Sequence, residues 1–370
     1  MNALMKIAVL GAGNGGYAAS ADLSLAGFKV NLFEFPDFEE NLKPIIEHKG
    51  IEIVGSARTG FAKLNKVTTS IKEAIEDVDL IMAVVPAFAH KILAKKCAPY
   101  IKDNQSIVLN PGHTGGALEF FNELKKEGFK GEVKIGETMT LTYICRKTAP
   151  AQVKVFHVMK KLLFGVFPSK YTNELYSLFK ELYPSITPAL NVLESGLTNL
   201  AAMFHPPGML LNAGWIEFTK GDFKFYYEGI TPSVARVVEA LDEERLKIME
   251  KLGFKPISFT EWYYLQGCTP IKAKSVYEAL QAGGPDQYLK APSTLNHRYV
   301  VEDINHGLVP MASIARMLNI PTPNMDALIR IGSTINQTDY WKEGLTVEKL
   351  GIANLSLERL KEFLEKGKLE

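Results

Sequence analysis

Two spacings of hydrophobic residues alternate in the first half of the chain. Short apolar runs end in glycine or proline, and stretches with helical spacing separate them. The runs that predict strands cover residues 6–10, 29–35, 79–86, 105–112 and 133–138, and residues 151–158 are a candidate to extend the sheet. Nearly continuous apolar strands are typical of a parallel sheet covered on both faces. This half is therefore expected to form a Rossmann-type, doubly wound α/β domain.

The pattern changes after about residue 185. Long stretches with helical spacing dominate from there on, and residues 234–253 and 356–368 are the clearest of them. Strand signals are scarce in this half. We expect a boundary near residue 187, with the Rossmann-type domain at 1–186 and a mostly α-helical domain at 187–370.

Composition narrows the class of protein without naming it. A net charge of +1 over 370 residues gives no general attraction to nucleic acid. Cys97, Cys145 and Cys268 are few and far apart, which argues against a disulfide framework and a structural zinc site. No apolar stretch is long enough to cross a bilayer, and glycines interrupt the one that resembles a signal peptide. These features predict a cytoplasmic protein with no membrane or nucleic-acid partner and no metal.

The first glycine-rich segment lies between a predicted strand and a predicted helix. Gly11, Gly13 and Gly16 form G-x-G-x-x-G, filled in by Ala12, Asn14 and Gly15. The first glycine permits the tight turn, the second lets a pyrophosphate approach the backbone, and the third lets helix and strand pack closely. The free N–H groups of the helix N-terminus then face the phosphates. The segment therefore predicts a dinucleotide cofactor.

Acidic residues near the end of the second predicted strand bear on which dinucleotide is bound. Glu34 stands where a carboxylate usually holds the ribose hydroxyls and would repel a 2′-phosphate. Asp37 is the alternative candidate for this position. We expect NAD to be preferred, and NADP stays open. The strand ends at Val85 and Pro86, and at Asn110 and Gly112, lie at the carboxyl edge, where the rest of the cofactor is expected.

Two segments of the second half carry ionisable residues in apolar surroundings. His205 lies in "AAMFHPPGMLLNAG", and Pro206 predicts that the helix ends or kinks at His205, which would aim the ring away from a helix face. A hydrogen-bonded core histidine is the alternative. In "NHRYVVEDINHGL", Arg298 and Asp303 stand beside apolar residues, so part of the segment should be buried. A buried arginine suits a substrate carboxylate, and a buried aspartate can orient an imidazole and raise its pKa.

The chain resembles the opine dehydrogenase family, which includes octopine and nopaline dehydrogenases. The resemblance lies in "GAGNGG" and in residues 137–146, 196–214, 225–245 and 296–308. It implies that His205 is the catalytic acid/base, that Asp303 pairs with it, and that Arg298 contacts substrate. It also implies that the stretch at 137–146 lines the substrate side of the cleft, through Thr138, Tyr143 and Cys145. This stretch has two more residues than the family's pattern, so the contacts of these three residues with substrate are left open.

The resemblance implies an NAD(P)H-dependent reductive condensation. The amine of an amino acid adds to a 2-oxo acid such as pyruvate, water leaves, and the imine is reduced. A hydroxy-acid dehydrogenase of the ketopantoate reductase type is the enzymatic alternative, and a dinucleotide-sensing regulator without catalysis is the non-enzymatic one. The expected partners are the two small substrates, and a homodimer is left open.

Overall fold

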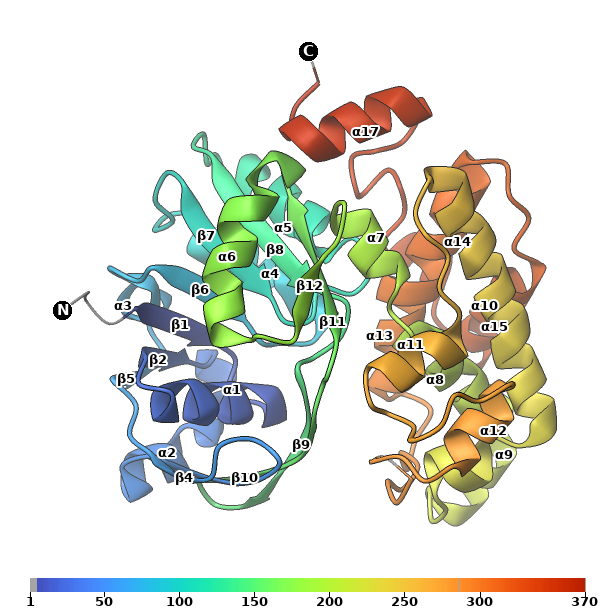
Figure 1. Cartoon of the computed structure of the whole chain (residues 1–370), viewed down its shortest axis with the longest axis horizontal. Coiled ribbons are helices and arrows are strands. Elements are labelled where there is room, and N and C mark those ends of the chain that lie inside the picture. The colour runs from blue at the N-terminus through green and yellow to red at the C-terminus, as the bar shows by residue number, and fades with distance from the viewer. Residues whose placement is uncertain (1–4, 286, 370) are drawn as a thin grey trace. The chain divides into compact units, whose positions relative to one another are not determined.

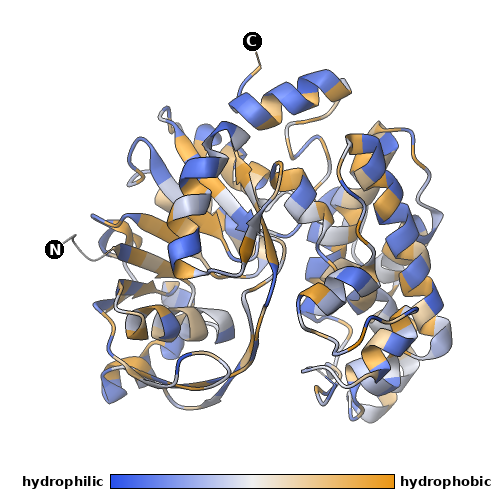
Figure 2. Cartoon of the chain, viewed as in Figure 1, coloured by the Kyte–Doolittle hydropathy of each residue, from blue (hydrophilic) through white to orange (hydrophobic). Residues whose placement is uncertain are grey.

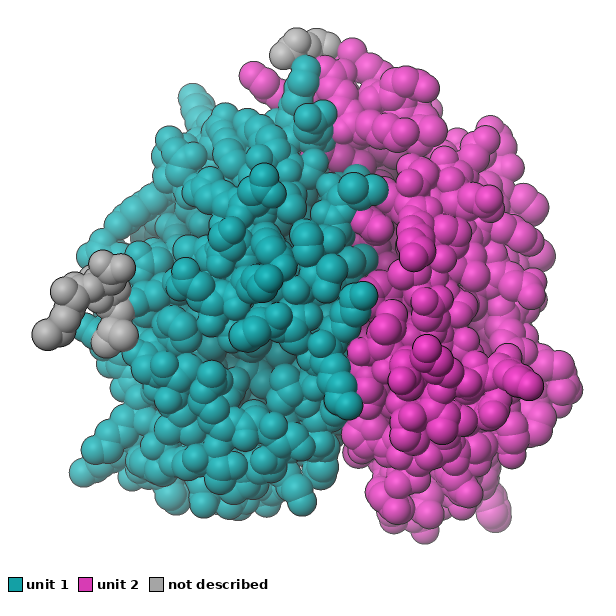
Figure 3. Space-filling model, viewed as in Figure 1, with its two compact units in different colours: residues 1–112, 116–192, 365–367 teal, residues 113–115, 193–364, 368–370 magenta. Residues whose placement is uncertain are grey.

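The computed structural model describes residues 5–285 and 287–369. It divides into two compact units (Figure 3). Unit 1 contains residues 1–112, 116–192 and 365–367, and unit 2 contains residues 113–115, 193–364 and 368–370. The predicted domain boundary near residue 187 stays a prediction. No helix in the described part of the chain is both long enough and apolar enough to cross a membrane.

Unit 1 is built on an eight-stranded sheet in the order β12-β11-β8-β7-β6-β1-β2-β5 (Figure 1). Neighbouring strands from β8 to β5 are all parallel, whereas β11 pairs antiparallel with β8 and parallel with β12. The strands are β1 (Lys6–Leu10), β2 (Lys29–Phe33), β5 (Lys66–Thr68), β6 (Leu80–Ala83), β7 (Gln105–Leu109), β8 (Val133–Thr138), β11 (Leu162–Phe167) and β12 (Ile186–Pro188). The Rossmann-type parallel sheet expected from the sequence is thereby confirmed.

The strands predicted from their apolar runs form the middle of this sheet. The last four residues of β1 and of β2, and all of β6, are buried, and Figure 2 shows the sheet mainly in the hydrophobic colour. Burial of apolar side chains on both faces stabilises such a sheet by roughly 25 cal/mol per Å² of apolar surface. The parallel order also brings the carboxyl ends of β1, β2, β6 and β7 to one edge.

The strand predicted at 151–158 does not extend this sheet. It is β10 (Gln152–Val158), which belongs to a four-stranded sheet with β3 (Ile51–Gly55), β4 (Gly60–Ala62) and β9 (Tyr143–Ala149). Val153 and Val155 are buried while Lys154 between them is exposed. This period of two is typical of a strand with one buried face, whereas strands inside the main sheet are buried on both faces.

Helices of unit 1 connect the strands and pack against them. They are α1 (Asn14–Leu25), η1 (Pro36–Asn41), α2 (Lys43–His48), α3 (Ile71–Ile75), η2 (Ala87–Ala89), α4 (His90–Cys97), α5 (Gly116–Lys126), η3 (Ser169–Tyr171) and α6 (Thr172–Leu182). The chain leaves α1 through Gly27, which has a positive φ of 97°. That conformation is easy for glycine and ends the helix before β2 begins.

Unit 2 is mostly helical in its described part. Its elements are α7 (Val192–Leu197, beginning at the last residue of unit 1), α8 (Ala201–Leu210), α9 (Ala213–Thr219), η4 (Phe225–Gly229), α10 (Pro232–Leu252), α11 (Phe259–Leu265), α12 (Val276–Gln281), α13 (Arg298–Asp303), η5 (Ile304–Leu308), α14 (Val309–Met317), α15 (Pro323–Ile335), α16 (Tyr340–Glu343) and α17 (Leu357–Lys366). The longest, α10, begins at the capping hydroxyl of Thr231 and ends at Gly253.

Candidate active site and cofactor site

The glycine turn between β1 and α1 has the geometry that the motif predicts. Gly11 has φ of 108°, and a Cβ there would meet the Val84 carbonyl oxygen at 2.6 Å. A Cβ on Gly16 would collide with the carbonyl oxygen of Gly11, whereas a Cβ on Gly13 would meet nothing within 4 Å. Gly13 is exposed and caps α1 without a side chain, and no acidic residue lies in the first turn. This cradle fits the pyrophosphate of a dinucleotide.

Glu34 lies directly beside that turn, one residue beyond β2. Its side chain is buried and accepts hydrogen bonds from the backbone N–H of Ala12 (3.0 Å) and Phe35 (2.8 Å). Asn41 Nδ2 donates to the same carboxylate at 3.2 Å. The rival acid, Asp37, is exposed on η1. The structure therefore joins Glu34, and not Asp37, to the backbone of the glycine turn.

The other predicted cofactor residues follow β6 and β7 at the carboxyl edge. Val85 is buried and Pro86 precedes η2. Asn110 is fully buried, and its Oδ1 accepts hydrogen bonds from the hydroxyls of Thr138 (3.0 Å) and Thr142 (3.2 Å). These bonds tie the end of β7 to the segment after β8. The buried side chain of Asn110 therefore supports the carboxyl edge of the sheet and does not project from it.

The three residues predicted to line the substrate side of the cleft are buried in unit 1. Thr138 contacts Asn110, as described above, and Cys145 is 1% exposed. The Tyr143 hydroxyl donates to Asp22 at 2.8 Å and lies 3.3 Å from the Tyr183 hydroxyl. Burial, together with these two neighbours, raises the pKa of Tyr143 well above its ordinary value. Substrate contacts for these residues stay a prediction.

The prediction that the helix ends at His205 is wrong, and the kink that was the alternative stays a prediction. Helix α8 runs from Ala201 to Leu210 and contains Pro206 and Pro207. The prolines remove the N–H donors that would pair with the carbonyls of Ala202 and Met203. Helix α8 nevertheless packs against α10, α13 and α15, and its residues from 202 to 210 are all buried. Tertiary burial here outweighs the local preference of a residue that precedes proline.

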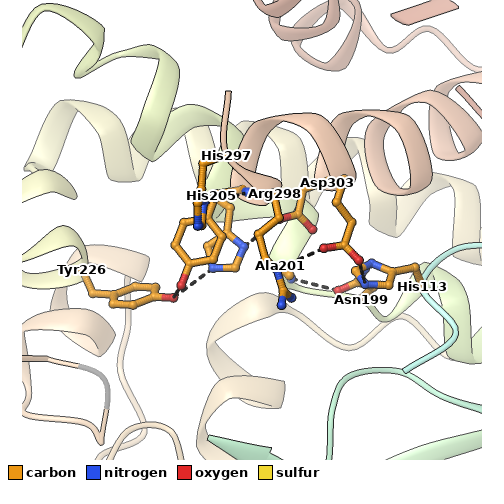
Figure 4. A network of polar contacts seen from close by, with 10 residues as sticks. His113, Asn199, Ala201, His205, Tyr226, His297, Arg298 and Asp303 are labelled. Carbon is orange, nitrogen blue, oxygen red and sulfur yellow. Dashed lines mark hydrogen bonds and ion pairs between the residues drawn. The ribbon is translucent and has the colours of Figure 1, made fainter. Parts of the chain in front are cut away.

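A buried pair at the face between α8 and α13 joins the two predicted catalytic residues (Figure 4). His205 Nδ1 lies 2.8 Å from Asp303 Oδ2, and both side chains are at least nine-tenths buried. His205 Nε2 lies 2.9 Å from the Tyr226 hydroxyl. With the neutral ring protonated on Nδ1, that nitrogen donates to the carboxylate and Nε2 accepts from tyrosine. Asp303 therefore fixes the ring orientation, and Nε2 faces the Tyr226 hydroxyl instead of a carboxylate.

The net shift of the histidine pKa is opposite to the sequence expectation. Burial lowers the pKa of His205 below its ordinary value, and the opposing effect of Asp303 does not restore it. Desolvation disfavours the charged imidazolium, whereas a nearby carboxylate favours it. The neutral ring is therefore the resting form at pH 7.

Arg298 begins α13 and is less enclosed than the sequence predicts. Its side chain is 51% exposed, and its Nε lies 3.1 Å from Glu302 Oε2 one turn later. The expectation of a buried arginine is wrong because the residue occupies the first position of the helix. Glu302, which is 1% exposed, raises the pKa of Arg298. Among the described residues, the guanidinium is thus anchored through its Nε contact with Glu302.

Glu302 has a second basic neighbour that sequence reasoning missed. His113 Nε2 lies 3.0 Å from Glu302 Oε1, and Asn199 contacts the other ring nitrogen at 3.0 Å. Burial alone would lower the pKa of His113, but Glu302 outweighs it and the pKa is raised. Tyr226 and Tyr299 were also missed as site residues. Only their nearness to the predicted motifs, at 225–245 and 296–308, could have indicated them.

Comparisons with known proteins identify the family of this chain. The model of the NAD/NADP octopine/nopaline dehydrogenase α-helical domain matches residues 188–336, and that of the NAD-dependent glycerol-3-phosphate dehydrogenase N-terminus matches residues 6–136. An opine dehydrogenase of Arthrobacter sp. (strain 1C) is 37% identical over 97% of this chain and 98% of its own. The chain belongs to the opine dehydrogenase family. It is an NAD(P)-dependent oxidoreductase acting on CH–NH groups.

Two solved structures have a fold similar to that of this chain. Octopine dehydrogenase in complex with NADH and agmatine superposes with a TM-score of 0.78 at 19% identity, covering 99% of both chains. A PanE/ApbA family ketopantoate reductase from Ralstonia eutropha JMP134 reaches 0.59 at 18% identity, covering 90% of this chain and 99% of its own. The full-length match to the Arthrobacter opine dehydrogenase favours reductive condensation over the hydroxy-acid dehydrogenase alternative. No group of three or more possible metal ligands occurs among the described residues.

Proposed function

We propose that His205 is the acid/base of an opine-forming reduction in which an amino acid condenses with a 2-oxo acid such as pyruvate. The observation that carries this role is the 2.8 Å contact between His205 and Asp303, both buried in the helical core of unit 2. An imidazole held at Nδ1 by a carboxylate exchanges protons only through Nε2. His205 would polarise the carbonyl oxygen in the reductive direction and accept the proton in the reverse direction.

Tyr226 would share the proton-exchanging position. Its hydroxyl contacts His205 Nε2 at 2.9 Å and the Tyr299 hydroxyl at 3.1 Å. A substrate oxygen that approaches Nε2 must replace or join that hydroxyl. The cofactor, when bound at the glycine turn, supplies the hydride.

Arg298 would hold a substrate carboxylate. Its Nε is occupied by Glu302, and the two terminal nitrogens of the guanidinium remain for a bidentate contact. Glu302 and His113 behind it keep the arginine in place. Thr138, Tyr143 and Cys145 are proposed to shape the substrate side from unit 1, and Gly11, Gly13, Gly16 and Glu34 to hold the cofactor, with NADH preferred.

The expected cytoplasmic location and the two-domain division belong to the same proposal. The chain has only three cysteines, and all three are buried, which suits a reducing compartment. A homodimer is open to a direct measurement by size-exclusion chromatography with light scattering.

The deciding experiment is NADH oxidation with pyruvate in the presence and absence of each amino acid, followed by mass spectrometry of the product. We expect turnover that requires the amine and a product that contains both substrates. Equal turnover with the 2-oxo acid alone would assign the hydroxy-acid dehydrogenase reaction. Binding of NADH without turnover on any substrate would instead favour a dinucleotide sensor.

A further inference from the structure

Lys147, on β9, lies against the glycine turn although it belongs to the second sheet of unit 1. Its backbone N–H donates to Asn14 Oδ1 at 2.8 Å, which joins β9 to the first residue of α1. Its Nζ donates to Asn41 Oδ1 at 2.8 Å and lies 3.4 Å from the carbonyl oxygen of Ala12.

The surroundings of this ammonium are almost entirely neutral. Lys147 Nζ lies 4.6 Å from the centre of the Tyr17 ring. Among the described residues, no carboxylate forms an ion pair with Lys147. Burial lowers the pKa of Lys147, and Glu34 opposes that effect from a distance. A half-buried cation that only dipoles and a ring hold is well suited to an anionic ligand.

Asn41 bridges Lys147 and Glu34, the acid that is expected to bind the ribose hydroxyls. Its Nδ2 donates to Glu34 Oε2 at 3.2 Å, and its Oδ1 accepts from Lys147 at 2.8 Å. One amide thus separates the two charges. The ammonium therefore lies on the ribose side of the turn, because Asn41 and Glu34 both follow β2, whereas the pyrophosphate is expected at Gly13 and Asn14.

We propose that Lys147 is the cation that receives the 2′-phosphate of NADPH, so that Glu34 and Lys147 together set the preference between the two nicotinamide cofactors. Segment η1, directly after β2, presents Asp37, Glu39 and Glu40 and contains no basic residue. The positive charge that faces the 2′-phosphate is therefore expected from Lys147 on β9. This role of Lys147 rests on the proposed ribose contact of Glu34.

Direct binding measurements on the full chain test the role without relying on turnover. NADH and NADPH are titrated into wild type, Lys147→Met, Lys147→Arg and the control Lys154→Met, which removes an exposed lysine of the neighbouring strand β10. We expect Lys147→Met to raise the Kd of NADPH roughly tenfold or more, the scale of one charged hydrogen bond. The Kd of NADH should stay within about twofold, and Lys147→Arg should retain NADPH binding.

A double-mutant cycle separates this role from general stabilisation of the turn. Glu34→Gln should lower the Kd of NADPH relative to that of NADH when Lys147 is present, and much less in the Glu34→Gln/Lys147→Met variant. Equal losses of NADH and NADPH in Lys147→Met would overturn the assignment in favour of a pyrophosphate contact or a structural role. Unchanged binding of both cofactors would overturn it as well. These outcomes do not depend on whether His205 catalyses an amine-dependent reaction.

Discussion

The imidazole of His205 lies parallel to the ring of Tyr299, with ring centroids 3.6 Å apart and planes inclined by 8°. The same tyrosine contacts Tyr226 through its hydroxyl at 3.1 Å, and Tyr226 contacts His205 Nε2 at 2.9 Å. Asp303 holds the opposite edge of the imidazole. The ring is therefore fixed across its face as well as at both nitrogens, and a rotation that moved Nε2 would disturb all three contacts.

Replacing Tyr299 should separate the stacking contact from the hydroxyl contact. Tyr299→Ala removes the ring that supports His205 and should lower kcat roughly tenfold, since an aromatic pair contributes about 0.5–1.5 kcal/mol beyond its buried area. Tyr299→Phe keeps the stack and should stay within about threefold of wild type. Steady-state kinetics of both variants decide the point, and equal losses would show that the hydroxyl, not the stack, is what matters.

His205→Ala should lower kcat by roughly 10²–10⁴-fold, the range for one positioned proton-transfer group. The variant should still bind NADH with the wild-type Kd, because the glycine turn belongs to unit 1. A histidine that only fills the core predicts the reverse, namely a lower Tm and nearly intact kcat per folded molecule. Measuring Tm, NADH affinity and kcat on the same preparation distinguishes the two roles.

The sequence predicts features that depend on neighbouring residues better than those that depend on tertiary packing. Strand β8 has the predicted limits, Val133 and Thr138, and the glycine turn has the predicted geometry, because short apolar runs and glycine sterics act locally. The apolar run of β11, Leu162–Phe167, is of the same kind and was missed.

The errors in unit 2 have a similar cause. The rule that proline ends a helix fails at Pro206, because packing around α8 decides the backbone there. His113 meets Glu302 from a position 189 residues earlier in the chain, and no spacing in the sequence indicates that pair. Lys147 likewise reaches the glycine turn from a strand of another sheet.

Asp303→Asn should move the pH dependence of turnover to lower pH. Asp303 favours the charged imidazole, so its neutral replacement lets burial lower the pKa of His205 further. In the reductive direction the reaction needs the proton on Nε2, and its rate should therefore fall at a lower pH than in wild type. Profiles of kcat against pH in both directions check the shift. A profile that stays in place with only a smaller amplitude would mean that the aspartate orients the ring without tuning its charge.

Arg298→Lys should raise the KM of the 2-oxo acid or of the amino acid by roughly tenfold or more, with NADH affinity unchanged. An ammonium cannot form the planar pair of bonds to a carboxylate and cannot keep the Nε contact with Glu302 at the same time. Arg316→Lys, which changes an exposed arginine paired with Asp326, is the matched control. If both organic substrates keep their wild-type KM, Arg298 does not bind a substrate carboxylate.

His306 should make the protein less stable in mild acid. Burial, with a further contribution from nearby His113, lowers the pKa of His306 from 6.5 to about 4. The unfolded chain takes up a proton below pH 6.5 and the folded chain does so only near pH 4, so folding loses free energy as pH falls between these values. At about 1.36 kcal/mol per pKa unit, the loss from this residue between pH 7 and pH 5 is about 2 kcal/mol.

Urea unfolding at pH 7 and pH 5 checks this contribution of His306. The free energy of unfolding should decrease less for His306→Gln than for wild type, while the exposed His48→Gln should behave as wild type does. Equal decreases in all three proteins would assign the acid sensitivity to other groups.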